Sequence, residues 1–139
     1  MKLDNLYEIS GSALNAQMVR LNTIASNLAN ISSAGSTPEE AYRPVKPVFS
    51  AIYKQAVGEN KGAALVQVDD VLEMPPSAKN KRYEPDNPLA DQEGYVFYPD
   101  INVMQEMADM LSATRSYQSS MEVMVSAKKL QQRLLSLGE

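Results

Sequence analysis

The last quarter of the chain reads NVMQEMADMLSATRSYQSSMEVMVSAKKLQQRLLSL (residues 102–137) and contains neither proline nor glycine. Apolar side chains recur in it at spacings of three and four residues, the pattern of a helix with one apolar face. Asn102 can cap this helix, with Gln105 at the third position of a capping box. We expect one helix about 54 Å long, with an apolar stripe made of Val103, Met107, Met110, Leu111, Thr114, Tyr117, Met121, Met124, Val125, Ala127, Leu130, Leu134 and Leu137.

A second proline-free segment opens the chain, because all eight prolines fall between Pro38 and Pro99. Asn5 and Glu8 have the spacing of a capping box, and a helix about 40 Å long is predicted over residues 4–30. Gly11 should weaken it by about 1 kcal/mol relative to alanine, although a small residue there could permit close helix approach. The apolar stripe of this helix consists of Tyr7, Leu14, Met18, Leu21, Ile24, Ala25, Leu28 and Ile31.

The segment between the two helices has the composition of short strands and turns. Runs rich in apolar residues at 45–53, 64–72 and 95–98 are separated by clusters of Gly, Pro, Asn and Asp. The predicted fold class is α+β, with two long terminal helices that pair as an antiparallel, coiled-coil-like rod and a small β-rich module between them. The expected domains are an N-terminal assembly helix (1–31), a Pro-rich β module (32–100) and a C-terminal assembly helix (101–139).

The chain lacks the residues that most enzymes and metal sites require. It contains no cysteine and no histidine, which removes the thiolate nucleophile, the commonest general base and the commonest metal ligand. Adjacent acids such as Asp69 and Asp70 would face opposite sides of a strand and could not readily act as a pair. We predict that the chain is not an enzyme and uses no cofactor.

Charge and hydropathy exclude two further classes of partner. The formal net charge of −4 argues against nucleic acid, whose binding depends on Lys and Arg neutralising phosphates. No run of roughly 18 apolar residues is present, so no membrane span is expected. Asp4 and Glu8 stand where a secretory signal has its apolar core, so no cleaved signal is expected either.

Two long amphipathic helices on a small module indicate assembly. Both helices are longer than the module is wide. Ordering a lone helix pair costs more free energy than burial alone returns, and backbone hydrogen bonds would make the pair only marginally stable. Five of the eight methionines lie on the C-terminal helix, and methionine adapts to irregular contacts. The predicted assembly interface comprises Tyr7, Leu14, Met18, Leu21, Ile24, Asn27, Leu28, Asn30, Met107, Met110, Leu111, Tyr117, Met121, Met124, Leu130 and Leu134.

Two stretches carry a resemblance to a known family. The N-terminal stretch RLNTIASNLAN (residues 20–30) ends in the pattern Asn-x-Ala-Asn. The C-terminal stretch combines NPLAD (87–91), GYVFYPDINV (94–103) and SATRSYQ (112–118). Together they resemble the flagellar axial family, which includes rod and hook subunits. The resemblance covers about half of the chain, including both ends.

This resemblance implies a structural subunit of the bacterial flagellar basal-body rod, in its proximal part. Such a subunit is exported by the flagellar type III apparatus without signal cleavage, and polymerises in the periplasm to link the membrane base to the distal rod. The implied partners are copies of itself, the rod subunits FlgB, FlgF and FlgG, and FliE, the adaptor between the rod and the MS ring. Asn27 and Asn30 would then either cap and turn the first helix locally or contact a neighbouring subunit.

One rival function stays open at this point. A cytosolic helical adaptor or export chaperone would also present amphipathic helices, and the methionines could simply fill the core of a monomeric helical hairpin. The adaptor should be stably helical at any concentration, whereas a rod subunit should gain helix on association.

Overall fold

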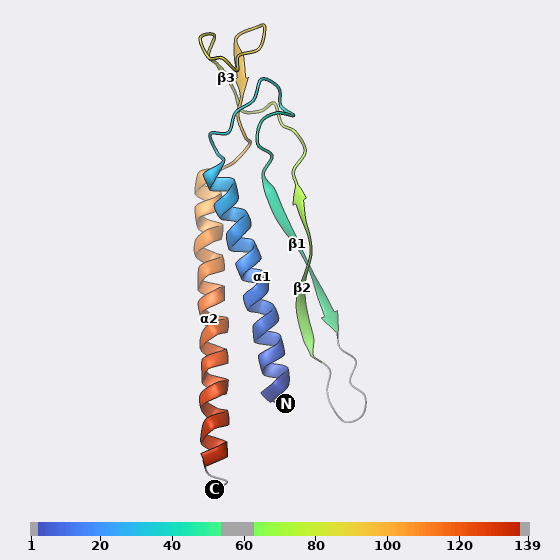
Figure 1. Cartoon of the computed structure of the whole chain (residues 1–139), viewed down its shortest axis with the longest axis vertical. Helices are drawn as coiled ribbons and strands as arrows, with labels where there is room; N and C mark the ends of the chain where they lie inside the picture. The colour runs from blue at the N-terminus through green and yellow to red at the C-terminus, as the bar shows by residue number, and fades with distance from the viewer. Residues whose placement is uncertain (1–2, 54–62, 137–139) are drawn as a thin grey trace.

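Helix α1 (Leu3–Ala29) lies between helix α2 (Val103–Ser136) on one side and a long β-hairpin on the other (Figure 1). The two helices run antiparallel, as predicted, and the hairpin runs beside α1 over much of its length. This is a computed structural model, and it describes residues 3–53 and 63–136. It confirms the predicted α+β class, with terminal helices on either side of a β-rich middle. The division into domains 1–31, 32–100 and 101–139 stays a prediction.

The predicted helix bounds agree with the structure to within one or two residues. Asn102 caps α2 as expected, because its side-chain Oδ1 accepts a hydrogen bond from the Gln105 backbone N–H at 3.2 Å. The N-terminal cap predicted at Asn5 is wrong, since α1 already begins at Leu3. Leu137, the last member of the predicted stripe, lies outside the described residues.

The described part of the middle of the chain forms two separate two-stranded sheets. Strands β1 (Val45–Tyr53) and β2 (Ala64–Glu73) pair antiparallel from Val45 opposite Glu73 to Tyr53 opposite Ala64, with a bulge between Val48 and Phe49. Strands β3 (Lys81–Tyr83) and β4 (Tyr95–Phe97) form a small sheet at the end of the molecule far from both termini (Figure 1). Strand β3 was not predicted, whereas the other three strands match to within one residue.

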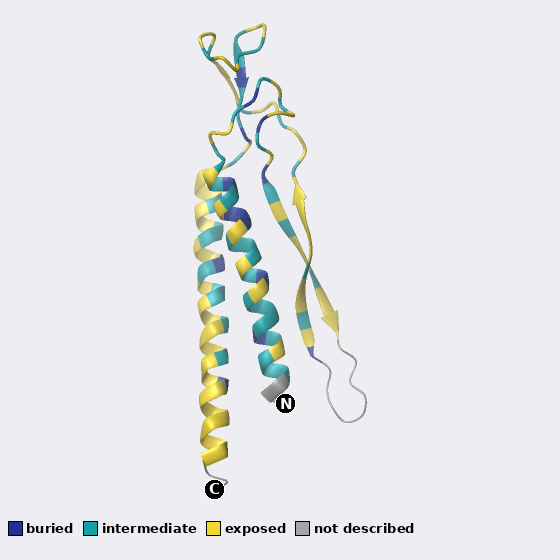
Figure 2. Cartoon of the chain, viewed as in Figure 1, coloured by how far each residue is buried: buried dark blue, intermediate teal, exposed yellow. Residues whose placement is uncertain are grey.

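Burial follows thin contact lines and does not form a central core (Figure 2). Most of the buried apolar residues are alanines, namely Ala16, Ala41, Ala63, Ala113 and Ala127. Larger apolar side chains remain at the surface, above all on α2, because α1 covers only one side of that helix. Within the described ranges, neither helix is long and apolar enough to cross a membrane.

Candidate assembly surfaces

One face of α2 packs along α1, and three polar contacts and one close approach, at Gly11, fix its position. Tyr7 Oη donates to Gln131 Oε1 at 3.2 Å, and a methyl group added at Gly11 would lie 4.0 Å from Met124 Cε. Further up, Arg20 pairs with Asp109 at 2.9 Å, and Asn27 donates to Glu106 at 3.2 Å. The residues of α2 on this face follow a spacing of alternately four and three, which we call the inner seam: Glu106, Met110, Ala113, Tyr117, Ser120, Met124, Ala127 and Gln131.

Small and polar residues dominate the inner seam. Ala113 is 0% exposed and Ala127 1% exposed, so the two helices approach closely at these positions. A spacing of four and three keeps one seam facing the partner helix along a gently supercoiled pair. The predicted coiled-coil-like pairing is therefore present, but the inner seam contains few of the large apolar residues that predicted it.

Five of those large residues lie instead on a second line of α2, which we call the outer stripe: Val103, Met107, Leu111, Met121 and Val125. Their side chains are 38–56% exposed. At 3.6 residues per turn, this line lies roughly a quarter-turn from the inner seam. The hairpin does not cover it, since among the helices and strands α2 contacts α1 alone, and α1 packs against the inner seam. The outer stripe is thus an apolar surface without an intrachain partner among the described residues.

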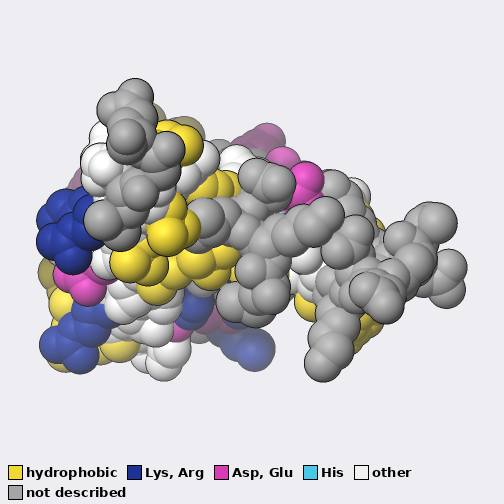
Figure 3. Space-filling view, turned by 90° about the horizontal axis from the view of Figure 1, so that it is seen from below, with side chains coloured by type: hydrophobic (Ala, Val, Ile, Leu, Met, Phe, Trp, Pro, Cys, Tyr) yellow, Lys and Arg dark blue, Asp and Glu magenta, His cyan; other side chains and the backbone are white. Residues whose placement is uncertain are grey.

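The C-terminal end of α2 extends past the start of α1 (Figure 1). Leu130, Leu134 and Leu135 are 55–68% exposed there. Seen from that end, hydrophobic side chains gather between basic ones (Figure 3). The basic cluster of Lys128, Lys129 and Arg133 belongs to this segment, where cations are favoured by the helix dipole.

The structure separates the predicted interface residues by burial. Ile24 and Asn27 are buried. Half-buried positions are Tyr7, Leu14, Leu21, Leu28, Asn30, Met110, Tyr117 and Met124. Exposed positions are Met18, Met107, Leu111, Met121, Leu130 and Leu134. Sequence periodicity did not identify Glu106, Ala113 and Ser120 as seam residues, although their four-and-three spacing with Met110 and Tyr117 was available as a signal.

Asn27 connects α1 to both α2 and the β1–β2 hairpin near the C-terminal end of α1. Its side-chain amide is 1% exposed and pairs with both backbone groups of Val45, donating to the carbonyl at 3.0 Å and accepting from the N–H at 2.9 Å. Tyr42 Oη also donates to Asn27 Oδ1 at 3.1 Å, and Glu106 Oε2 accepts from Nδ2 at 3.2 Å. The amide therefore ties the first strand and the first turn of α2 to the end of α1.

Asn30, the second asparagine of the motif, acts at the helix terminus. Its Nδ2 donates to the Ser26 carbonyl at 2.9 Å, and its Oδ1 accepts from Ser33 Oγ at 3.1 Å. The Ser26 carbonyl also accepts the Asn30 backbone N–H at 3.1 Å, so the side chain adds a second hydrogen bond to the same carbonyl at the helix terminus. Both asparagines thus have local structural roles within the chain.

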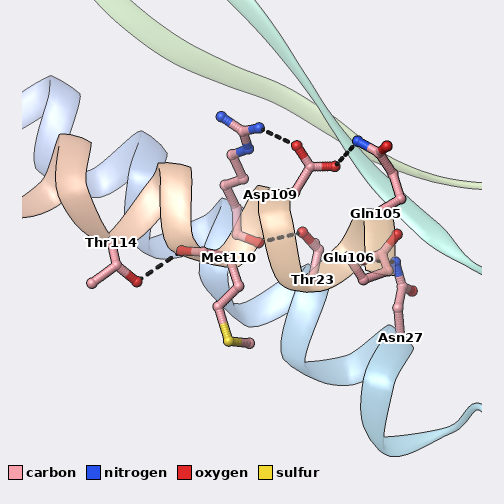
Figure 4. A network of polar contacts seen from close by, with 8 residues as sticks. Thr23, Asn27, Gln105, Glu106, Asp109, Met110 and Thr114 are labelled. Atoms are coloured by element: carbon pink, nitrogen blue, oxygen red, sulfur yellow. Dashed lines mark hydrogen bonds and ion pairs between the residues drawn. The ribbon is translucent and has the colours of Figure 1, made fainter. Parts of the chain in front are cut away.

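A polar network continues from Asn27 along the interface between the helices (Figure 4). Asp109 accepts from the Arg20 guanidinium and, at 3.2 Å, from Gln105 Nε2. About a third of each ion-pair side chain is exposed, and such pairs contribute about 0–1 kcal/mol. The network therefore fixes the helix register more than it stabilises the fold.

Aromatic and charged side chains pack against one another in and beside the small β3–β4 sheet. Lys81 Nζ lies 4.5 Å from the centre of the Tyr95 ring, and the Arg82 guanidinium lies 4.5 Å from the centre of the Tyr98 ring. Tyr98 Oη donates to the Glu84 carboxylate at 3.2 Å. Partial burial of Tyr98, and next its hydrogen bond to Glu84, raise the pKa of the Tyr98 phenol above its usual value.

A cleft of about 440 Å³ lies where this upper part meets the start of α2. Pro38, Pro44, Pro75, Pro76 and Pro99 line it together with parts of the first turn of α2. No cluster of three or more acidic side chains that could hold a metal ion occurs in residues 3–53 and 63–136.

The chain matches two protein families in the regions that form these surfaces. Residues 8–35 match the family described as flagella basal body rod protein, and residues 92–137 match the C-terminal family of the flagellar basal body rod FlgEFG proteins. The flagellar basal-body rod protein FlgC of Escherichia coli O6:H1 is 44% identical over the full length of both chains. The chain belongs to the FlgC family. FlgC of Salmonella typhimurium is 42% identical over the full length of both chains, and FlgC of Aquifex aeolicus 38% over 96% of this chain and 95% of its own.

Membership of the FlgC family confirms the resemblance seen in the two sequence stretches. The chain is a structural subunit of the bacterial flagellar basal-body rod. The Asn-x-Ala-Asn pattern lies within the first matched region, and the whole of α2 lies within the second. Family membership thus favours the rod subunit over the helical adaptor or export chaperone.

Proposed function

We propose that this subunit is built into the rod through the outer stripe of α2, which neighbouring subunits cover. The observation that carries the proposal is the exposure of Val103, Met107, Leu111, Met121 and Val125 along one line of a helix. Complete burial of such a side chain stabilises a structure by about 1.5–3 kcal/mol. Since around half of each is still exposed, each has about 1 kcal/mol left to contribute.

The predicted interface residues fall into two groups in this proposal. The exposed residues Met18, Met107, Leu111, Met121, Leu130 and Leu134 contact other subunits. The buried and half-buried residues hold α1, α2 and the hairpin together within one chain, and so present the outer stripe in a fixed orientation. Methionine at three of the exposed positions suits neighbours that are not all alike.

The proposed partners are copies of this chain, the rod subunits FlgB, FlgF and FlgG, and the adaptor FliE. The type III export apparatus is the proposed carrier of the chain. The role is structural and non-catalytic, and it involves neither nucleic acid nor a cofactor. Support comes from family membership together with an acidic net charge of −4, which disfavours polyanionic partners.

The test compares two aspartate substitutions on the exposed side of α2. Met121→Asp places a charge in the outer stripe, and Ser126→Asp places the same charge on an exposed polar position. Burying an unpaired carboxylate in an apolar contact is strongly unfavourable, so Met121→Asp should abolish incorporation into rods and swimming. Ser126→Asp should assemble normally, and both isolated variants should unfold in urea within about 1 kcal/mol of the parent chain.

Normal incorporation of Met121→Asp would show that the outer stripe is not a contact between subunits. A large loss of stability in the isolated variant would instead place Met121 inside the fold of one chain. Rod content is measured in purified basal bodies, and stability by circular dichroism in urea.

A further inference from the structure

The β1–β2 hairpin is a two-stranded sheet, so within residues 3–53 and 63–136 each of its strands has one edge without a strand partner. Along an antiparallel strand, successive residues point their N–H and C=O groups alternately toward and away from the partner strand. Two contacts fix which residues point away. Both backbone groups of Val45 bond to Asn27, and the Val66 N–H donates to Ser12 Oγ at 3.3 Å. Ala51, opposite Val66, therefore points its backbone groups away from β2, as do Val45, Pro47, Phe49 and Tyr53.

The half of the β1 edge that begins at Val45 is closed, meaning that it cannot pair with an added strand. At its upper end the Asn27 amide occupies the outward groups of Val45. Two residues further along, Pro47 has no N–H to offer to an incoming strand. An added strand therefore cannot pair with β1 between residues 45 and 47.

The edge of β2 is closed over both halves. The Val71 N–H donates to Asp70 Oδ1 at 2.7 Å, and Glu73 forms an ion pair with Arg43. In the lower half the edge faces α1, where Ser12 accepts from Val66. Charged side chains and local coverage are the usual means by which proteins protect a sheet edge.

One edge segment remains open, the lower half of β1 at Phe49, Ala51 and Tyr53. Within the described residues, no hydrogen bond engages their outward backbone groups. Phe49 is 39% exposed and Tyr53 77% exposed. An exposed apolar edge with free backbone groups is a template for pairing with another strand.

We propose that this open edge pairs with the same edge of a second copy of the chain. Within the described part of this hairpin, a second copy offers no other open edge, because both halves of β2 and the upper half of β1 are closed. The segment is also self-complementary in an antiparallel arrangement centred on Ala51. Ala51 of one copy then faces Ala51 of the other, and each Phe49 faces a Tyr53, a kind of aromatic cross-strand pair that stabilises sheets.

The pairing joins two hairpins into one four-stranded antiparallel sheet. It forms about six backbone hydrogen bonds, two for each facing pair of outward residues. A two-fold contact between the same edge segment of each copy closes at the dimer and does not by itself extend into a filament. It lies on the other side of α1 from α2 (Figure 1), and so goes beyond the outer-stripe contacts of the proposed function.

Cysteine substitution tests this geometry directly, because the chain contains no cysteine of its own. Facing residues of a hydrogen-bonded antiparallel pair have Cα atoms about 5.5 Å apart, within the range of a disulfide. Under mild oxidation, Ala51→Cys should form a disulfide-linked dimer at least tenfold faster than Val71→Cys, which places a thiol on the closed edge of the same hairpin. Equal rates for the two variants would overturn the pairing.

Analytical ultracentrifugation of the full chain over a range of concentrations provides the second measurement. Ala51→Pro removes the central outward N–H but spares the ladder to β2, as Pro47 already does in the same strand. It should weaken dimerisation at least tenfold, whereas Met121→Asp should leave it unchanged. A chain that stays monomeric at all concentrations, or an Ala51→Pro dimer as tight as that of the parent, refutes the proposal.

Two other results would assign the surfaces differently. A dimer that Met121→Asp abolishes and Ala51→Pro does not would overturn the edge pairing while supporting the outer stripe. Loss of rod incorporation in Ala51→Pro without any dimer of the parent chain would give the edge to a different rod component, which also overturns the pairing of two copies.

Discussion

Replacing Asn27 by aspartate should weaken the attachment of α2 and the β1–β2 hairpin to the C-terminal end of α1. The substitution keeps the shape of the side chain but removes the two hydrogen bonds that Nδ2 donates to the Val45 carbonyl and to Glu106. A neutral bond contributes about 1 kcal/mol and one to a charged group about 1.5–3 kcal/mol. The new carboxylate would also lie against Glu106 at a position that is 1% exposed.

Part of this loss is offset, because the Val45 N–H and Tyr42 Oη would then donate to a charged acceptor. The net expected loss is about 3 kcal/mol, a large share of the 5–15 kcal/mol typical of a whole domain. Urea denaturation followed by circular dichroism measures it. Asn22→Asp makes the same change on an exposed position of the same helix and should alter stability by less than about 0.5 kcal/mol. A difference between the variants below about 1 kcal/mol would refute the role given to Asn27.

Two further predictions concern two glycines and the β3–β4 sheet. Gly35→Ala would place a methyl group 2.6 Å from the backbone N of Ala41 and should destabilise the chain by about 1–3 kcal/mol, whereas Gly11→Ala, with room for the methyl, should stabilise it by about 0.5–1 kcal/mol. The pKa of Tyr98 is raised in the folded chain by burial and then by Glu84, so its neutral form is favoured. The advantage of the parent chain over Tyr98→Phe should therefore be complete below pH about 10 and shrink as the pH rises through the folded pKa, which urea titrations from pH 8 to about 11 will show. An unchanged stability in Gly35→Ala, or a constant difference for Tyr98→Phe, would contradict these two accounts.

The helices and the main hairpin were predictable because each has a local signal. Proline-free periodic segments predicted α1 and α2, and apolar-rich runs bounded by turn residues predicted β1 and β2. Strand β3 has no such signal, since Lys81, Arg82 and Tyr83 are all exposed and its three residues owe their extended form to pairing with β4. Tertiary context, and not local sequence, therefore determines this strand.

The two faces of α2 show the limit of periodicity more clearly. Met110 and Met107 belong to one apolar stripe in the sequence, but the first lies on the inner seam and the second is 56% exposed. An apolar side chain favours burial, but the sequence pattern does not indicate whether the same chain or a neighbouring chain buries it. The inner seam is marked instead by small residues such as Ala113 and Ala127, which allow close helix approach.

The position of α1 has a consequence for when the fold can form. Both elements that cover this first helix come later in the chain, and its contact from Tyr7 to Gln131 spans 124 positions. A helix of this length is only marginally stable alone in water, and distant contacts must wait for the closure of large loops. If the polypeptide emerges N-terminus first, α1 therefore cannot complete its packing until nearly all of α2 has emerged. Until then the chain is not locked into its final fold and can pass through a narrow channel.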